Sequence, residues 1–330
     1  MFSSVFLVLI GAAAAAKPQA YTSPLHVENF ISTGPSLDMV SSLIIGSEAA
    51  VIIDLPLAVP QALELADWVA NTTDKPLVAA FSTHFHPDHY LSGAAFLEKF
   101  PETKFYANSK AAALIKNEAE QKVKQWKGIL GDSSVVDKAA VPTPYDFTFF
   151  SLPGDEASPI YLLSPLVTDT IDATLFWIPS ISTLIAGDSV YSHTVHLWLA
   201  DLLSPALTES WLSTLDYVAH LKAQRIIPGH SLSLESFSAT RDLKHSRRYV
   251  QFFKYQIQAK GPNFFTPQEI FNKFDTAFPG LLSSDSQTSA TLLNITSDQF
   301  GRGGTRVVHY VDLAAYDNVA GLEGWMLGSE

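Results

Sequence analysis

The 330-residue sequence contains no cysteine. This absence excludes disulfide bonds, thiol nucleophiles, iron–sulfur clusters and thiolate metal ligands, so nitrogen and oxygen atoms must bind any metal ion. Charged residues are also scarce, at 16%, whereas hydrophobic residues reach 47%. This composition excludes intrinsic disorder and favours a chain with a large buried core.

Basic residues are few as well, because 21 Lys and Arg stand against 33 Asp and Glu, for a formal net charge of -12. Proteins that bind nucleic acid gain most of their affinity from Lys and Arg contacts with phosphates. The densest basic segment here, KHSRR at residues 244–248, is short. We therefore expect no nucleic-acid partner. A single hydrophobic core stops growing near ~250–300 residues. The length therefore fits one large domain, or one domain and a half.

The N-terminus has the pattern of a secretory signal. Residues 1–20, MFSSVFLVLIGAAAAAKPQA, contain an apolar run over 5–16 that is too short to span a bilayer. We predict a signal peptide over 1–20 and a secreted protein, with a buried N-terminal helix as the alternative. Sequons at Asn71 and Asn294 agree with a secreted glycoprotein. No other segment qualifies as a membrane anchor, so no membrane partner is expected.

Strands and helices alternate along most of the chain. Short apolar runs between turn residues predict strands, and apolar residues spaced three to four apart predict helices. The expected strands are 26–32, 40–45, 50–54, 77–82, 104–107, 148–152, 160–163, 174–178, 183–186 and 225–227. The expected helices are 60–71, 91–100, 110–129, 204–220, 234–259 and 266–278, the last opened by a capping box at Thr266 and Glu269. The prediction is an α/β fold in which two mixed β-sheets pack together with helices outside.

Three histidines occur within six residues, in the segment THFHPDH directly after the predicted strand 77–82. In extended backbone, residues two apart point the same way, so His84 and His86 can converge on one point. Asp88 and His89 then aim at a second point beside it. Imidazole plus carboxylate without thiolate suits zinc, and also manganese or iron. A histidine-rich surface loop is the alternative explanation.

This segment resembles the His-x-His-x-Asp-His signature of the metallo-β-lactamase fold superfamily. Three further motifs follow that family's order: VIID at 51–54, IAGD at 185–188 and IIPGH at 226–230. The resemblance covers roughly residues 25–235. It implies a four-layer αβ/βα sandwich, with a catalytic domain over 21–235 and a mostly helical C-terminal extension over 236–330 packed on it. Asp54, which ends the VIID motif, is expected to support the loop that contains His84, His86 and His89.

By this resemblance, two divalent metal ions share one ligand. Metal one is bound by His84 and His86, metal two by Asp88, His89 and His230, and both ions by Asp188. Zinc is favoured, with manganese or iron as alternatives. From the residues alone, Asp188 is also explained as a turn residue and His230 as a loop residue.

One element of the family pattern is missing, because no histidine lies between His89 and Asp188 to complete metal one. Asp169 occupies the best-matching position. A carboxylate can bind zinc at ~2.0–2.2 Å, so Asp169 is predicted to replace the histidine. This harder ligand set would favour manganese or iron more than usual. The alternative is that metal one is weak or absent and Asp169 is a turn residue.

The polar and aromatic residues that follow Asp188 in the sequence lead to further hypotheses. Tyr191 lies three residues after Asp188, as in lactone-hydrolysing members of the family, where it polarises the substrate carbonyl; a packed aromatic is the alternative. His196 and Trp198 belong to a stretch similar to one found in uncharacterised hydrolase-like relatives. His196 is expected to support the ligands, face the substrate or replace a ligand, and His193 is expected at the surface.

The resemblance implies a hydrolase in which a metal-activated hydroxide opens a lactone, lactam, ester or thioester. Tyr191 and Asp88 are the predicted catalytic residues, with Asp88 or Asp188 transferring the proton. The substrate is a small molecule, and aromatic side chains near the motifs favour an apolar or aromatic one: Phe85, Trp177 and Trp198. A mononuclear iron oxygenase and a non-catalytic metal-binding protein are the alternatives. The C-terminal extension offers a contact for a homodimer.

Overall fold

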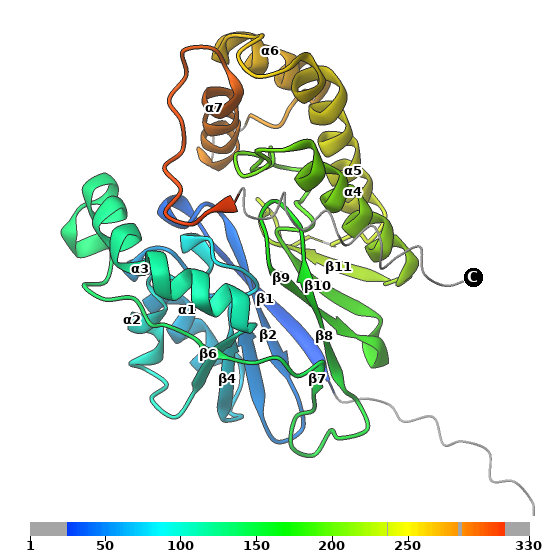
Figure 1. Cartoon of the computed structure of the whole chain (residues 1–330). Coiled ribbons are helices and arrows are strands. Elements are labelled where there is room, and N and C mark those ends of the chain that lie inside the picture. Colours follow the sequence, from blue (N-terminus) through cyan, green and yellow to red (C-terminus); the bar gives the residue numbers. More distant parts are fainter. Residues whose placement is uncertain (1–24, 236, 283–285, 314–330) are drawn as a thin grey trace, which may run out of the picture.

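The structure, a computed structural model, describes residues 25–235, 237–282 and 286–313. Two β-sheets pack face to face, with helices on both outer sides (Figure 1). This arrangement confirms the predicted α/β sandwich of two mixed sheets. The predicted signal peptide at 1–20 lies outside the described residues. Within them, no helix combines the length and hydrophobicity needed to cross a bilayer.

The first sheet has six strands and the second has five. The order in the first is β1 (His26–Ser32), β2 (Met39–Ile45), β3 (Ala50–Ile53), β4 (Leu77–Phe81), β5 (Lys104–Ala107) and β6 (Thr143–Pro144). The order in the second is β11 (Arg225–Pro228), β10 (Thr183–Gly187), β9 (Ala173–Ile178), β8 (Ile160–Leu166) and β7 (Phe149–Phe150). Strands β3 to β6 run parallel, as do β10 and β11, and all other pairs are antiparallel.

The helices lie outside the sheets and at one end of the sandwich. They are α1 (Val59–Thr72), α2 (Gly93–Leu97), α3 (Ser109–Leu130), α4 (Pro205–His220), α5 (Arg241–Phe252), α6 (Pro267–Ala277) and α7 (Thr288–Phe300). Figure 1 shows α1 to α3 on the side of the first sheet, α4 and α5 on the side of the second, and α6 and α7 together at one end. The C-terminal region is therefore helical, as predicted.

Two details of the C-terminal helices differ from the prediction. The helix expected from 234 begins only at Arg241, because Ser238 forms an isolated β-bridge with Arg225 and draws the preceding chain alongside β11. Helix α7 was not predicted, because its Thr- and Ser-rich sequence has weak helix propensity and its stability comes from packing. The capping box of α6 is present, with the Thr266 hydroxyl accepting from the Glu269 N–H.

Both sheets contribute side chains to the layer between them. Phe81 of β4 packs on Phe176 of β9 with ring centroids 5.4 Å apart, and Ile53, Ile185 and Ile227 are buried in the same cluster. Burial of such side chains contributes about 1.5–3 kcal/mol each. This packing fixes the two sheets relative to each other, and so fixes the loops at their edges.

One edge of the sandwich collects the ends of four strands. The carboxyl ends of parallel neighbours meet at the same edge of a sheet, which places the end of β3 beside β4 and the end of β10 beside β11. The two sheets are joined there, because the Val40 N–H donates to the Gly229 carbonyl at 2.8 Å and Met39 bridges to His230. Loops after these strands therefore converge.

Candidate metal centre

Seven side chains meet at this edge, and they are the seven residues predicted as metal ligands. Their nitrogen and oxygen atoms lie within 4.8 Å of one another in two groups. One group is His84, His86, Asp169 and Asp188, and the other is Asp88, His89 and His230. They come from the loops after β4, β8, β10 and β11. The folded chain thus brings together residues separated by up to 146 positions (230 − 84).

The second group, together with Asp188 of the first, has ligand-atom spacings close to those of a tetrahedral zinc site. The Nε2 atom of His230 lies 3.3 Å from Asp88 Oδ2 and 3.2 Å from Asp188 Oδ2. The Nε2 atom of His89 lies 3.3 Å from Asp188 Oδ1 and 3.7 Å from Asp88 Oδ2. Zinc bonds of ~2.0–2.2 Å in a tetrahedron separate neighbouring ligand atoms by roughly 3.3–3.6 Å. One cation therefore fits among these four side chains.

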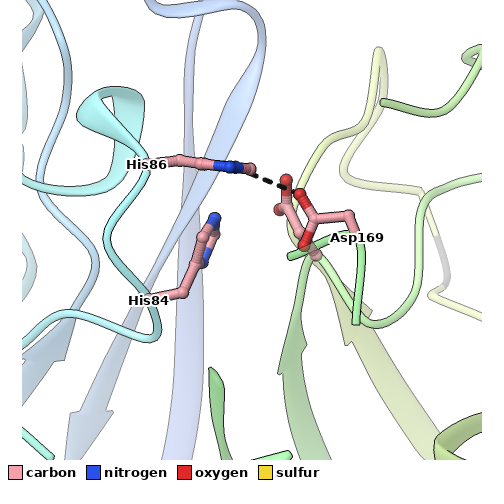
Figure 2. Close-up of side chains that lie close together, drawn as sticks. His84, His86 and Asp169 are labelled. Carbon is pink, nitrogen blue, oxygen red and sulfur yellow. Dashed lines mark ion pairs between the residues drawn. The ribbon is translucent and has the colours of Figure 1, made fainter. Parts of the chain in front are cut away.

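The first group is centred on the loop histidines and Asp169 (Figure 2). Asp169 is fully buried, and its Oδ2 atom lies 3.1 Å from His86 Nδ1. The ring of His84 lies against the ring of His86, with centroids 4.7 Å apart. A buried carboxylate requires a partner. The position of Asp169 inside this group argues against an ordinary surface turn.

Asp54, at the end of β3, holds two of the histidines through one carboxylate. It accepts from the Thr83 N–H at 2.7 Å and the Thr83 hydroxyl at 2.9 Å, and it contacts His89 Nδ1 at 2.9 Å. Because the Thr83 hydroxyl donates to Asp54, it accepts from His84 Nδ1 at 2.9 Å. Both rings therefore present Nε2 to the centre, which is how outer partners orient metal-binding imidazoles. The predicted support of the metal loop by Asp54 is confirmed.

Asp201 holds His86 in the opposite orientation. Its Oδ2 atom lies 2.9 Å from His86 Nε2, which leaves Nδ1 facing Asp169. Thr170, Trp198 and His309 also bond to this carboxylate, at 2.6, 3.1 and 3.1 Å. No sequence motif identified Asp201 as a functional residue, although it ends the stretch that contains His196 and Trp198. Asp201 is buried, and its carboxylate contacts these four side chains. We therefore assign it as the residue that positions the His86 ring.

Replacement of Asp201 by alanine is expected to weaken metal binding at the first group by roughly 10–100-fold, because His86 loses the partner that orients its ring. Zinc competition against a chromophoric chelator measures this affinity. The second group provides an internal control, since its histidines are held by Asp54 and by the Leu37 carbonyl, 2.7 Å from His230 Nδ1. Unchanged zinc affinity at both groups would contradict the role given to Asp201.

Two glycines give the carboxylate of Asp188 its place. A Cβ atom at Gly229 would lie 1.8 Å from Asp188 Oδ1, so only glycine leaves room for this side chain. Gly187 has φ +49°, in the left-handed region, and its Cβ would meet Thr83 at 3.0 Å. The Gly-Asp motif after β10 and the Pro-Gly-His motif after β11 therefore pack directly against each other.

The electrostatics of the group favour a cation. Burial opposes protonation of His230, but the neighbouring carboxylate of Asp188 outweighs it and raises the pKa of His230 to about 10. Burial also opposes ionisation of Asp188, but His230 and His89 hold its pKa well below the usual range. Without a metal ion, protons on the histidines balance the carboxylates. A metal ion must displace those protons, so its affinity is expected to rise with pH.

The residues present fit two metal ions. Within the described part of the chain, three buried atoms at the centre have no hydrogen-bond partner: His84 Nε2, His89 Nε2 and Asp188 Oδ1. Such atoms carry a desolvation cost of about 1–3 kcal/mol each when nothing binds them. Imidazole nitrogens and carboxylate oxygens are the donors that zinc, manganese and iron accept.

A cavity of about 360 Å³ opens beside the centre. At one end it is lined by Asp88, Asp188 and His230, and most of its remaining wall is apolar. Residues 305–311 form part of this wall, and Figure 1 shows the segment after α7 running back from the end of the sandwich toward α3. Its size and its apolar lining with few polar groups are typical of a small-molecule site.

The other predicted residues divide between the centre and the core. Tyr191 is buried and donates from its hydroxyl to Asp188 Oδ2 at 2.5 Å. His196 lies outside both groups, and its Nδ1 pairs with the Tyr249 hydroxyl at 2.9 Å, as in a core histidine. His193, which was expected at the surface, is partly exposed, and its Nδ1 lies 2.8 Å from the buried Asp242 carboxylate.

Comparison with known proteins agrees with this geometry. Residues 36–230, more than half of the chain, match the metallo-beta-lactamase superfamily. The chain belongs to this superfamily. As a member with two groups of candidate ligands, it has the architecture of a metal-dependent hydrolase.

Several solved metallo-beta-lactamases are similar to this superfamily member. One from Pontibacter korlensis is 19% identical, with a TM-score of 0.48 over 69% of this chain and 99% of that chain. IND-7 is 20% identical, with a TM-score of 0.46 over 71% and 96%. FIM-1 from Pseudomonas aeruginosa, in a mono-zinc form, is 18% identical, with a TM-score of 0.46 over 70% and 92%. No curated protein matches the chain.

Proposed function

We propose that this chain is a dinuclear metal-dependent hydrolase. Metal one would be held by His84, His86 and Asp169, metal two by Asp88, His89 and His230, and Asp188 would contact both. The observation that carries this proposal is the convergence of these side chains into two groups, the second with the 3.2–3.7 Å spacing of a tetrahedral site. Zinc is the favoured ion, with manganese or iron as alternatives.

Divalent cations at such a centre supply two things: they lower the pKa of water towards ~7 and they polarise a carbonyl group. The chain's own part is to place a proton acceptor beside the cavity. Asp88 and Asp188 both line it. Burial opposes the ionisation of Asp88, but His89 and His230 outweigh it and lower the pKa of that carboxyl, so it is ionised at neutral pH. We propose Asp88 as the group that accepts and returns the proton.

Tyr191 supports the same chemistry from one side of the cavity. Burial raises the pKa of Tyr191 well above its usual range, so its hydroxyl keeps the proton and acts as a donor. That hydroxyl donates to Asp188 and its ring stacks on His230, with centroids 5.3 Å apart. We propose that Tyr191 positions Asp188. Its direct donation to the substrate carbonyl stays a prediction.

The cavity supports an acyl substrate with an apolar or aromatic body: a lactone, lactam, ester or thioester. Phe85 and Trp198 line the cavity, together with aliphatic side chains of α7 and of residues 305–311. Trp177 does not belong to this lining, because it lies on β9, where it faces Leu184 and Tyr161 of the neighbouring strands. The secreted location, glycosylation at Asn71 and Asn294, and a homodimer all stay predictions.

Removal of metal tests the function directly. The zinc-loaded full chain is expected to hydrolyse at least one member of a chromogenic panel of esters, lactones, lactams and thioesters. A chelator is expected to abolish that activity, and added zinc to restore it, because the activated water depends on the ions. A chain that carries two zinc ions and turns over no member of the panel would contradict a hydrolase. Oxygen consumption by the iron-loaded chain would favour an oxygenase instead.

A further inference from the structure

Helix α3 presents a charged residue to the cavity where its pattern calls for an apolar one. Glu118 is only 1% exposed, and the other buried residues of this helix are Ala111, Ala112, Ile115, Ala119 and Val123. An amphipathic helix places apolar residues on its covered face. Glu118 lies on that face and lines the cavity.

Among the described residues, no hydrogen bond or ion pair accounts for the burial of the Glu118 carboxyl. Its Oε1 atom makes no hydrogen bond, and no ion pair joins it to Lys122, one helical turn away, within the part of the chain that the structure describes. Instead, the Lys122 ammonium lies over the ring of Tyr310, 5.5 Å from its centroid. Burial raises the pKa of Glu118 to about 7. An unpaired buried carboxyl is costly, so a structural role alone does not account for it.

Two further side chains of α3 line the same cavity. Their polar atoms, Gln125 Oε1 and Trp126 Nε1, are buried and have no hydrogen-bond partner among the described residues. Residues 118, 125 and 126 are seven and eight positions apart, which places them on one face of a helix. The cavity therefore has the candidate metal centre at one side and a row of unsatisfied polar atoms on α3.

We propose that Glu118 determines specificity by accepting a hydrogen bond from a hydroxyl or ammonium group on an otherwise apolar acyl substrate. This inference rests on the proposed hydrolase function, since it names the substrate class of the same site. An apolar chain matches most of the cavity wall, and a donor group on it satisfies the carboxyl that the fold leaves unpaired. A substrate without the donor leaves that carboxyl buried and unpaired.

The test uses p-nitrophenyl esters of straight-chain acids of equal length that end in methyl, hydroxyl or ammonium, with the zinc-loaded full chain. The hydroxyl- or ammonium-ended ester is expected to exceed the methyl-ended one in kcat/KM by roughly 10–100-fold. Glu118→Leu is expected to remove this difference.

Glu118→Gln distinguishes the hydroxyl-ended from the ammonium-ended ester, because it keeps an acceptor for the hydroxyl and removes the charge that favours the ammonium. Glu120→Gln, an exposed neighbour paired with Lys124, is the matched control.

The proposal is overturned if Glu118→Leu leaves the ratio of kcat/KM between donor-ended and methyl-ended esters unchanged. It is also overturned if the wild type prefers the methyl-ended ester. Should the zinc-loaded chain hydrolyse none of these esters, calorimetry with the corresponding free acids tests Glu118 instead. The hydrolase function itself fails only if the chain turns over no member of the wider panel of esters, lactones, lactams and thioesters. Tighter binding of the donor-ended acid by wild type, lost in Glu118→Leu, supports the proposal. Equal binding of the acids by wild type overturns it.

Thermal unfolding gives a readout that does not depend on substrate. Glu118→Leu is expected to raise Tm by about 2–4 °C, because it replaces an unpaired buried carboxyl with an apolar side chain of similar size. A fall in Tm would mean that the carboxyl has a structural partner, and would overturn the assignment of Glu118 to substrate recognition.

Discussion

Substitution of Asp188 by alanine is expected to remove both metal ions and abolish hydrolysis. Asp188 belongs to the first group and also lies 3.2 Å from His230 and 3.3 Å from His89 of the second. Loss of an outer hydrogen-bond partner weakens metal binding by roughly 10–100-fold, and loss of a shared direct ligand is expected to exceed that at both sites. Elemental analysis of the dialysed variant, together with its kcat/KM, measures the effect.

Asp242→Asn is the matched control for this experiment. Asp242 is also a buried carboxylate paired with a histidine, but its partner is His193 and it lies outside both groups. It is expected to keep both ions. Circular dichroism of each variant establishes that the fold is retained. Two ions per chain in Asp188→Ala, at wild-type affinity, would show that Asp188 does not bind metal.

Substitution of Asp169 by alanine is expected to lower the zinc content from two ions per chain to one. Asp169 contacts His86 at 3.1 Å and belongs only to the first group, so Asp88, His89 and His230 keep their ion. Affinity at the first group is expected to fall by more than roughly 100-fold, since a direct ligand is lost. Elemental analysis and zinc titration distinguish loss of one ion from loss of both.

Asp169→His provides the conservative comparison, because it restores the three-histidine set that the superfamily resemblance implies. We expect this variant to keep two zinc ions, and to shift preference from manganese or iron toward zinc, since imidazole is a softer donor than carboxylate. An Asp169→Ala variant with unchanged metal content would show that Asp169 is not a ligand. Metal one would then rest on His84, His86 and Asp188 alone.

The sequence pattern and the superfamily resemblance together identified the seven side chains that converge. The segment from His84 to His89 follows a strand, so its geometry is local. Asp188 and His230 each follow a strand of the second sheet, and the parallel pairing of β10 and β11 brings them to one edge. The superfamily order of motifs identified these two, and position counting identified Asp169.

The residues that support the centre could not be predicted in the same way. Asp201 reaches His86 across 115 positions, and the Leu37 carbonyl reaches His230 across 193. Both contacts depend on how the two sheets are joined, which no local spacing encodes. Glu118 occurs in the predicted helix 110–129, where the local sequence does not distinguish it from the exposed Glu120. The return of residues 305–311 toward α3, together with α7, helps to enclose it in a cavity, and no local spacing encodes these contacts.

Anomalous difference density from crystals of the zinc-loaded full chain, recorded at the zinc edge, tests the central claim most directly. We predict two peaks, one within ~2.0–2.2 Å of His84, His86 and Asp169 and one within the same distance of Asp88, His89 and His230. Density at Asp188 should contact both. Absence of a peak from both groups, or zinc bound only elsewhere on the chain, would contradict a dinuclear centre at this edge of the sandwich.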